Sequence, residues 1–305
     1  MASEATTTQV LARARSTLDL AHRWGYAPTL ASLAGSLLGG EVPEPDLRVA
    51  LRLAPDIVVL DGHAALRGHQ DLIGPSRERA VRDRIRNGEA RALAEAFAAD
   101  LLRACPFIRC LAITGSVASG GYDDGDDIDF DLVVRDGTKY ICYLEANLLG
   151  LRYAIQRRRT RRASRDRLLL LPKVVCVNVI WTESDTDPFV RQDRHLAFEL
   201  LRAQPLFGAG RFAEILRRNA WIGPIFPQAY RRAFADEIVP RPGALAGLLE
   251  GIASRPRWLA RVERLARSVA RVLYVLVQTS RTDPEAKARA AFLRRVKFPY
   301  EVFQD

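Results

Sequence analysis

The spacing of apolar residues along the chain divides it into predicted helices and short predicted strands. Apolar side chains recur every three or four positions, as on the buried face of a helix, over much of the sequence. The helical segments are 10–24, 28–38, 44–53, 77–105, 139–158, 193–204, 211–219, 244–253, 257–278 and 284–296. Apolar runs typical of strands lie at 56–60, 108–114, 127–134 and 174–181. From residue 188 onward we therefore expect helices throughout.

The order of these elements predicts an α+β protein. Strand, loop, strand, helix, loop and strand follow one another between residues 108 and 181, a run of the size of a small mixed-sheet domain. We expect this core at 77–186, between an N-terminal helical region at 1–76 and a C-terminal helical domain at 187–305. Three helices followed by a short strand give residues 1–76 a winged-helix-like outline, and a plain helical cap is the alternative.

Composition adds a cellular setting to this fold. The hydrophobic fraction of 48% is ordinary for a packed globular protein. No apolar run reaches the ~20 residues that a membrane helix needs. The first residues also lack the basic and then apolar layout of a signal peptide. We therefore expect a soluble, cytoplasmic protein without a membrane partner.

The net charge of +10 comes largely from one segment. Residues 151–173 hold nine basic side chains and a single acid, Asp166. The charge therefore describes one arginine-rich loop, not the whole surface. The four cysteines and four histidines are scattered without the close pairs of a zinc site, and we expect buried, reduced thiols.

One segment, residues 111–134, combines residue types that a metal–triphosphate site requires. A strand leads to Gly115 and Ser116, where backbone N–H groups and a hydroxyl can approach phosphate oxygens. Alternation along the next strand places Asp127, Asp129 and Asp131 on one face, with apolar residues on the other. Carboxylates this close repel each other unless a cation such as Mg²⁺ binds between them. A solvated acidic turn that ends in an ordinary strand is the alternative.

This arrangement resembles the signature of the DNA polymerase β-like nucleotidyltransferase superfamily: an apolar strand, Gly-Ser, a loop, and then Asp-apolar-Asp. The resemblance implies that Asp127 and Asp129 bind magnesium and that Gly115 and Ser116 hold the triphosphate. It also implies a third acid on a neighbouring strand, which helps to activate the acceptor. The wider chain is similar to bacterial nucleotidyltransferase-domain proteins with a winged-helix-like N-terminal part, through the Cys-x-Asn strand at 176–178 and the helix at 196–208.

The chain departs from the superfamily pattern at the third acid. The strand at 174–181 offers Asn178, which can coordinate a metal through its carbonyl oxygen but cannot accept a proton as a general base. Asp131, on the face of the other two aspartates, is the residue that can compensate. The candidate catalytic residues are therefore Asp127, Asp129, Asp131 and Asn178.

The expected activity is Mg²⁺-dependent transfer of a nucleoside monophosphate from a nucleoside triphosphate to a hydroxyl or phosphate acceptor, with release of pyrophosphate. The acceptor is a small molecule or an RNA. Lys173 and the arginines of 157–167 are candidates for contacting the triphosphate. Two alternatives stay open: a repurposed fold that binds a nucleotide or another activated substrate without transfer, and a nucleic-acid-binding regulator that uses the winged helix.

Overall fold

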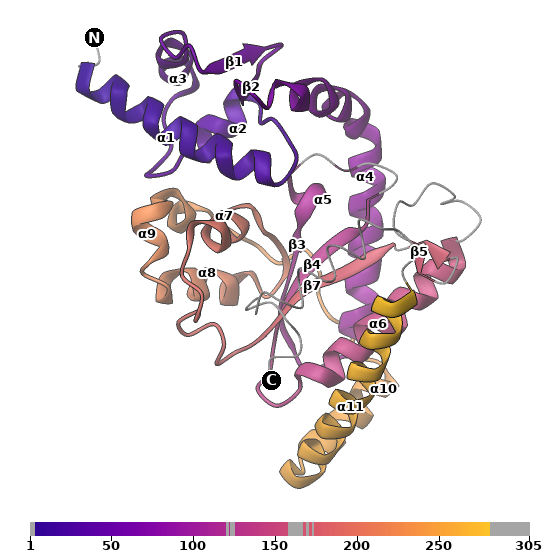
Figure 1. Cartoon of the computed structure of the whole chain (residues 1–305). Coiled ribbons are helices and arrows are strands. Elements are labelled where there is room, and N and C mark those ends of the chain that lie inside the picture. Colours follow the sequence, from indigo (N-terminus) through magenta and orange to yellow (C-terminus); the bar gives the residue numbers. More distant parts are fainter. Residues whose placement is uncertain are drawn as a thin grey trace. The chain divides into compact units, whose positions relative to one another are not determined.

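The computed structural model describes residues 4–119, 122, 126–157, 167–168, 171–172 and 174–280, and only the backbone of 4–6, 80–87, 167–168, 171–172 and 274–280 (Figure 1). The chain forms two compact units, and each contains several separate stretches of sequence. Unit one comprises residues 1–85, 192–202 and 216–233, and unit two comprises residues 86–191, 203–215 and 234–305. The three-part division expected from the sequence stays a prediction.

Unit one begins with three helices and a hairpin. The helices are α1 (Glu4–Arg23), α2 (Leu30–Gly35) and α3 (Glu44–Leu51), and the antiparallel strands are β1 (Ile57–Leu60) and β2 (His63–Leu66). The two turn residues, Asp61 and Gly62, have φ angles of 49° and 75°. Positive φ at both positions is typical of the tight turn that matches the twist of a hairpin. Three helices followed by a β element is the order expected from the sequence, and the winged helix itself stays a prediction.

Later segments of the chain complete unit one. They are α7 (Arg194–Arg202), α9 (Ile222–Ile225) and the 3₁₀ helix η2 (Pro227–Arg231), while the 3₁₀ helix η1 (Gln70–Leu72) follows the hairpin. The Gly39 N–H donates to the Ile225 carbonyl at 2.7 Å, and Gln228 Nε2 donates to the Leu37 carbonyl at 2.9 Å. These bonds fix the late segments to the loop after α2.

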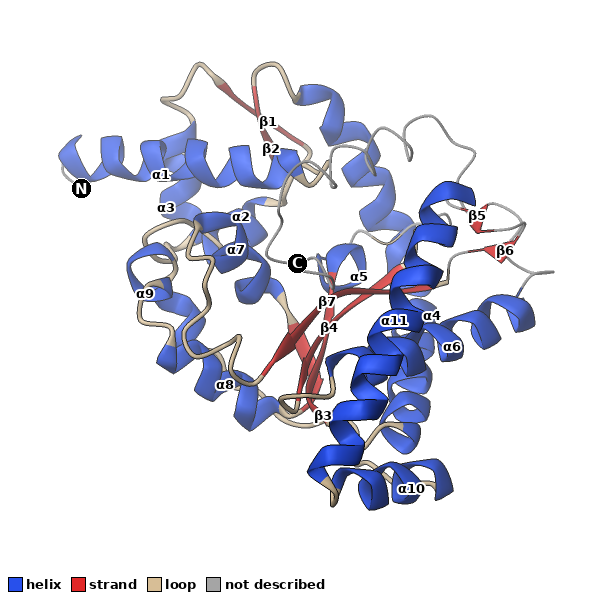
Figure 2. Ribbon diagram, turned by 60° about the horizontal axis from the view of Figure 1, so that its bottom comes forward, coloured by secondary structure: helices blue, strands red, loops and turns tan. Residues whose placement is uncertain are grey.

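Unit two is built around a four-stranded mixed sheet in the order β7-β4-β3-β8 (Figure 2). The strands are β3 (Ile108–Thr114), β4 (Ile128–Val134), β7 (Val175–Thr182) and β8 (Gln204–Phe207). Strand β4 runs antiparallel to β3 and parallel to β7, and β8 runs antiparallel to β3. The expected α+β class and the strands at 108–114, 127–134 and 174–181 are confirmed.

Strand β8 corrects the expectation of helices alone after residue 188. It has four residues and includes Pro205, and it pairs with β3 at the edge of the sheet. An edge strand tolerates proline because one side of it needs no backbone donor. Such a short strand gives no measurable alternation, and the proline here indicates a helix end equally well. The prediction of helices throughout this part of the chain is therefore wrong at 204–207.

Helices cover the sheet and bury its apolar side chains. The long helix α4 (Ile73–Ala104) contributes Phe97, whose ring stacks on Phe130 of β4 at 5.2 Å between centroids and meets Tyr153 edge-on at 5.4 Å. Tyr153 belongs to α6 (Lys139–Arg157), and both phenylalanines are almost fully buried. Edge-on and offset ring pairs of this kind stabilise a core beyond their buried area.

The C-terminal helices α10 (Ala244–Ala253) and α11 (Pro256–Ser280) belong to unit two, and α11 packs along α6. The Glu263 carboxylate of α11 accepts the backbone N–H groups of Tyr140 and Ile141, at 2.8 and 3.1 Å. These N–H groups lie in the first turn of α6, where no helical partner exists for them. The remaining elements are α8 (Ala209–Arg218) and the two-residue strands β5 (Arg167–Leu168) and β6 (Leu171–Pro172). Among the described residues, no helix has the length and apolar character to cross a membrane.

Candidate metal and nucleotide site

The turn at the end of β3 brings Gly115 against Asp129. Strand β3 ends at Thr114, and the short helix α5 (Gly115–Ser119) begins at the next residue. Gly115 has a φ of 63°, and a Cβ built on it overlaps the Asp129 carboxylate and lies 3.0 Å from the Asp129 Cβ. Position 115 therefore requires glycine for two reasons, its left-handed backbone and the carboxylate in contact with it.

Asp127, Asp129 and Cys176 form a cluster whose three possible ligand atoms all lie within 4.8 Å of one another. The sheet brings them together, because Asp129 pairs with Thr114 of β3 on one side and with Cys176 of β7 on the other. All three side chains are half-buried. Two of these residues are the metal ligands expected from the sequence, and the third is a cysteine to which the sequence assigned no role.

Cys176 also corrects the expectation that the thiols are buried. Cys105, Cys110 and Cys142 are buried, whereas Cys176 is partly exposed, and none of the four forms a disulfide. The sequence shows Cys176 only as part of a Cys-x-Asn motif. Its position beside the aspartates depends on the parallel register of β4 and β7, and the spacing of apolar residues does not determine that register.

Asp131 lies deeper in the sheet than the other two aspartates. It is only 5% exposed, and its Oδ1 accepts the Thr114 hydroxyl at 3.4 Å. Burial raises the pKa of the nearby Cys110 thiol, and the negative charge of Asp131 raises this pKa further. Among the described residues, Asp131 does not belong to the cluster that could hold a metal ion.

Asn178 occupies an irregular position on β7. The pairing shifts between Phe130↔Val177 and Asp131↔Val179, so Asn178 is the extra residue of a bulge. Its side chain is exposed, and its Oδ1 accepts the Cys176 thiol at 3.6 Å. Strand β7 therefore offers a thiol and an amide next to Asp129 of β4, and it contains no carboxylate.

The C-terminal end of α5 is held by strand β8. Gln204 Nε2 donates to the Ala118 carbonyl at 3.0 Å, and Gln204 Oε1 accepts Arg91 Nη1 at 2.7 Å. Arg91 in turn donates to Glu237 at 2.6 Å. These bonds fix the short helix that carries Ser116, which is itself half-buried. Sequence reasoning missed this group of residues because it comes from four distant segments.

Most of the cationic residues expected near the triphosphate lie outside the part of the chain that the structure describes. Lys173 and residues 158–166 lie outside the described residues, and Arg157 is exposed at the end of α6. The described part of the site thus consists of the Gly115–Ser116 turn, the two aspartates and Cys176.

No protein-family model, curated protein or solved structure matches the chain. The structure itself defines an α+β protein with a mixed four-stranded sheet and an acidic group suited to a metal ion.

Proposed function

We propose that this protein is a metal-dependent nucleotidyltransferase of the polymerase β-like class, with a nucleoside triphosphate as donor and a small molecule or an RNA as acceptor. The observation that carries the proposal is the contact between Gly115 and Asp129, with Asp127 beside it. A turn suited to phosphate and two carboxylates suited to a metal ion thereby meet at one end of the sheet.

The residues present fit a divalent cation. Magnesium in proteins commonly binds one or two carboxylates together with phosphates of the substrate, and Asp127 and Asp129 supply the two carboxylates. Cys176 adds a thiol, a softer ligand that suits Mn²⁺ less well than Zn²⁺. The donor set therefore accepts Mg²⁺ through its oxygens and gains affinity for thiophilic ions through its sulfur.

In this proposal Asp127 and Asp129 hold the cation, and Ser116 and the adjacent backbone N–H groups contact the triphosphate. A bound cation would neutralise charge on the triphosphate and on the departing pyrophosphate. The acceptor oxygen forms a bond to the α-phosphorus, the bond from that phosphorus to the bridging oxygen breaks, and pyrophosphate leaves. The proton of an acceptor hydroxyl passes to water, because strand β7 offers Asn178 where an acid is expected and Asp131 is only 5% exposed.

The test is transfer of label from each of the four α-labelled triphosphates, with Mg²⁺ or Mn²⁺, to a panel of small molecules and RNAs. Asp127→Ala and Asp129→Ala should each lower transfer by about 100-fold or more. Asp46→Ala is the matched control, because Asp46 is an exposed aspartate of α3 in the other unit. Transfer that is unchanged by both active-site substitutions would contradict the assignment of Asp127 and Asp129 as metal ligands.

Cys176 provides a second readout that does not depend on turnover. It is the one cysteine of the four that is not buried, so a thiol reagent such as iodoacetamide should modify it first in the folded protein. Mn²⁺ with a triphosphate should slow this modification, and Asp129→Ala should remove the protection. Equal modification rates with and without the metal and the triphosphate would contradict a shared site.

The second candidate is a repurposed fold that binds a nucleotide or another activated substrate without transfer. The absence of a carboxylate from strand β7, where Cys176 and the exposed Asn178 stand instead, favours it. Calorimetric titration with triphosphates, coupled to an assay for pyrophosphate, separates the two candidates. Tight binding without pyrophosphate release under any acceptor would favour the second.

A further inference from the structure

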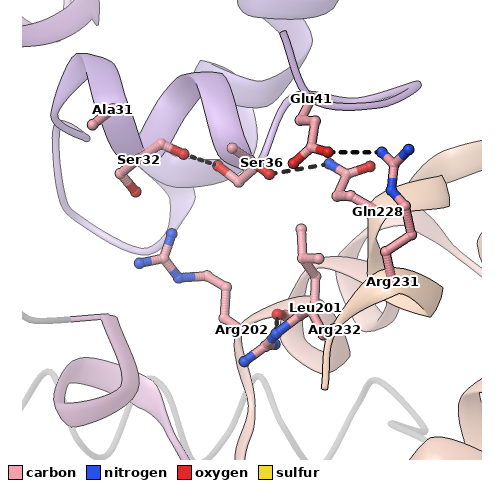
Figure 3. A pocket seen from close by; sticks show the side chains of 10 residues that line it. Ala31, Ser32, Ser36, Glu41, Leu201, Arg202, Gln228, Arg231 and Arg232 are labelled. Atoms are coloured by element: carbon pink, nitrogen blue, oxygen red, sulfur yellow. Dashed lines mark hydrogen bonds and ion pairs between the residues drawn. The ribbon is translucent and has the colours of Figure 1, made fainter. Parts of the chain in front are cut away.

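Two buried side-chain oxygen atoms outside the candidate site, Gln228 Oε1 in unit one and Glu145 Oε2 in unit two, have no hydrogen-bond partner within the described part of the chain. Gln228 lies on the wall of a pocket in unit one (Figure 3), and its Nε2 donates to the carbonyls of Leu37 and Gly35. These bonds give Gln228 a structural role, because they attach η2 to the end of α2. Glu145 instead has a neighbour with chemistry of its own, the Cys105 thiol, to which it is hydrogen-bonded.

Cys105 and Cys142 form a buried pair of thiols in unit two. Cys105 directly follows α4, and Cys142 lies in the first turn of α6. Their Sγ atoms are 3.3 Å apart, and the two side chains are 1% and 0% exposed. The S–S bond of a disulfide is ~2.05 Å long, so the two sulfur atoms need to approach by only about 1 Å to form one.

The C-terminal helices α10 and α11 are attached to the chain on both sides of this thiol pair. The Gly243 N–H, just before α10, donates to the Arg103 carbonyl in the last turn of α4 at 2.9 Å. The Glu263 carboxylate of α11 accepts the N–H groups of Tyr140 and Ile141 in the first turn of α6. Both thiols belong to the apolar cluster to which α10 and α11 also contribute. An oxidant therefore reaches the thiols when these helices separate locally from the cluster.

We propose that Cys105 and Cys142 are a redox site, which a small peroxide oxidises to a disulfide. The Cys105 sulfur attacks one peroxide oxygen, so that an S–O bond forms and the O–O bond breaks. The Glu145 carboxylate accepts the thiol proton and passes it to the departing hydroxide, which becomes water. The Cys142 sulfur then bonds to the Cys105 sulfur, the S–O bond breaks, and hydroxide leaves as water with the Cys142 proton. Two thiols are thereby oxidised to one disulfide, and one hydrogen peroxide is reduced to two water molecules.

The surroundings of the pair determine how fast it reacts and what the bond connects. The hydrogen bond with Cys142 and burial raise the pKa of the Cys105 thiol, so the closed structure holds little thiolate and oxidation is slow. The disulfide joins the two ends of a segment that contains β3, α5 and β4. This segment carries Gly115 and Asp129, but the redox site does not rest on the proposed nucleotidyl transfer.

Peptide mapping by mass spectrometry, after treatment of the full chain with hydrogen peroxide, tests the proposal. We expect a peptide pair joined between Cys105 and Cys142, which dithiothreitol separates. Cys110 is the internal control, because it is equally buried and contacts no other sulfur atom of the described residues, and it should stay reduced. Separate oxidation of Cys105 and Cys142 to sulfinic acids would overturn the proposal. A pair that stays reduced while Cys176 is oxidised would overturn it too.

The role of α11 in access is tested by Glu263→Gln. This substitution weakens the two hydrogen bonds to the start of α6, and it should speed disulfide formation by about 10-fold or more. Glu250→Gln is the matched control, because Glu250 is an exposed glutamate of α10, and it should change the rate less than ~2-fold. Equal rates in the two variants would contradict access through the separation of α11 from α6. If Glu263→Gln unfolds the protein, the peptide map of the unaltered chain still decides the question.

The role of Glu145 is tested by Glu145→Gln at pH 8. The amide cannot accept the thiol proton, so the disulfide should form about 10-fold more slowly or less. Hydrogen exchange of the Tyr140 and Ile141 amides reports the separation of α11 from α6 in the same variant. The slowing of disulfide formation should exceed any slowing of this exchange. Equal slowing of both would show that Glu145 acts through stability alone, and would remove it as the proton acceptor.

Discussion

Gly115 begins helix α5 and Asp129 lies on strand β4 of unit two, and the packing of each restricts the other. The carboxylate of Asp129 occupies the space in which any larger residue at 115 would put its Cβ. Gly115→Ala should therefore displace Asp129 as well as strain the backbone. We expect a loss of about 2 to 4 kcal/mol in the free energy of unfolding, measured by urea titration, together with a loss of metal protection at Cys176.

Gly137 offers the matched control for this substitution. It lies in the turn after β4 with a φ of 75°, and a Cβ there meets nothing within 4 Å. Gly137→Ala should cost only the left-handed backbone penalty, about 1 to 2 kcal/mol, and should leave the metal protection of Cys176 intact. Equal costs for the two variants would show that Asp129 does not restrict position 115.

A second prediction for a single residue concerns the ionisation of Glu145 on α6. Burial raises the pKa of its carboxyl group to about 7 from an ordinary value of 4.5, against a smaller opposing effect of a hydrogen bond with Cys105. The folded protein therefore keeps this proton over a range in which the unfolded chain loses it. The free energy of unfolding should fall as the pH rises from about 4.5 to about 7, and the lost stability should not return above pH 7.

Glu145→Gln removes this ionisation and keeps the shape of the side chain. At pH 4 the variant and the unaltered protein should have similar stability. At pH 8 the variant should be more stable by about 1 to 2 kcal/mol, a discounted figure because the side chain is partly exposed to solvent. Urea unfolding at a series of pH values measures the difference. Parallel curves for the two proteins would show that Glu145 has the same pKa in both states.

At the scale of elements, the short helix α5 depends on strand β8. The five residues of α5 are too few to be stable alone, and the Gln204 amide binds the carbonyl of Ala118 near its end. Gln204→Leu keeps the volume of the side chain and removes this bond. Backbone amides of α5 should then exchange with solvent at least about 10-fold faster in hydrogen-exchange mass spectrometry.

The strand pairing supplies the internal reference for this experiment. Residues of β3 that pair with β4, such as Ile113 with Phe130, should keep their protection in the Gln204→Leu variant. Faster exchange throughout β3 would mean that the substitution weakens the whole sheet. Unchanged exchange in α5 would mean that Gln204 does not hold the helix.

The same scale explains which parts of the site could be predicted from the sequence. Strands β3, β4 and β7 are long apolar runs, so their existence and approximate ends followed from residue type. Strand β8 has four residues, too few for alternation to show. The position of Cys176 beside Asp129 and the bulge at Asn178 depend on how β4 and β7 align. Pairing between strands separated by more than forty residues is a tertiary property, which local patterns do not encode.

At the scale of the whole molecule, the chain crosses between the two units five times, at 85/86, 191/192, 202/203, 215/216 and 233/234. Yet one apolar cluster of unit one comes entirely from residues 11–64. The later segments add buried apolar side chains of their own to this unit, such as Phe198 and Phe226, together with the Gly39 and Gln228 hydrogen bonds. This cluster of unit one therefore forms from one continuous stretch of sequence, whereas the rest of the unit is built by the later segments.

This difference predicts the behaviour of a fragment that comprises residues 1–85. The fragment should fold, because it contains the whole core cluster, and should show the helical circular dichroism of α1 to α3 with a cooperative thermal transition.

Hydrogen exchange by NMR shows which part of this fragment depends on the later segments of unit one. The Gly39 amide, which donates to Ile225 in the full chain, should lose its protection. The Leu33 amide donates to Thr29 within α2, and it should stay protected in both proteins. An unfolded fragment would mean that residues 216–233 are needed for the core itself. Protection of Gly39 in the fragment would mean that the loop after α2 is ordered without them.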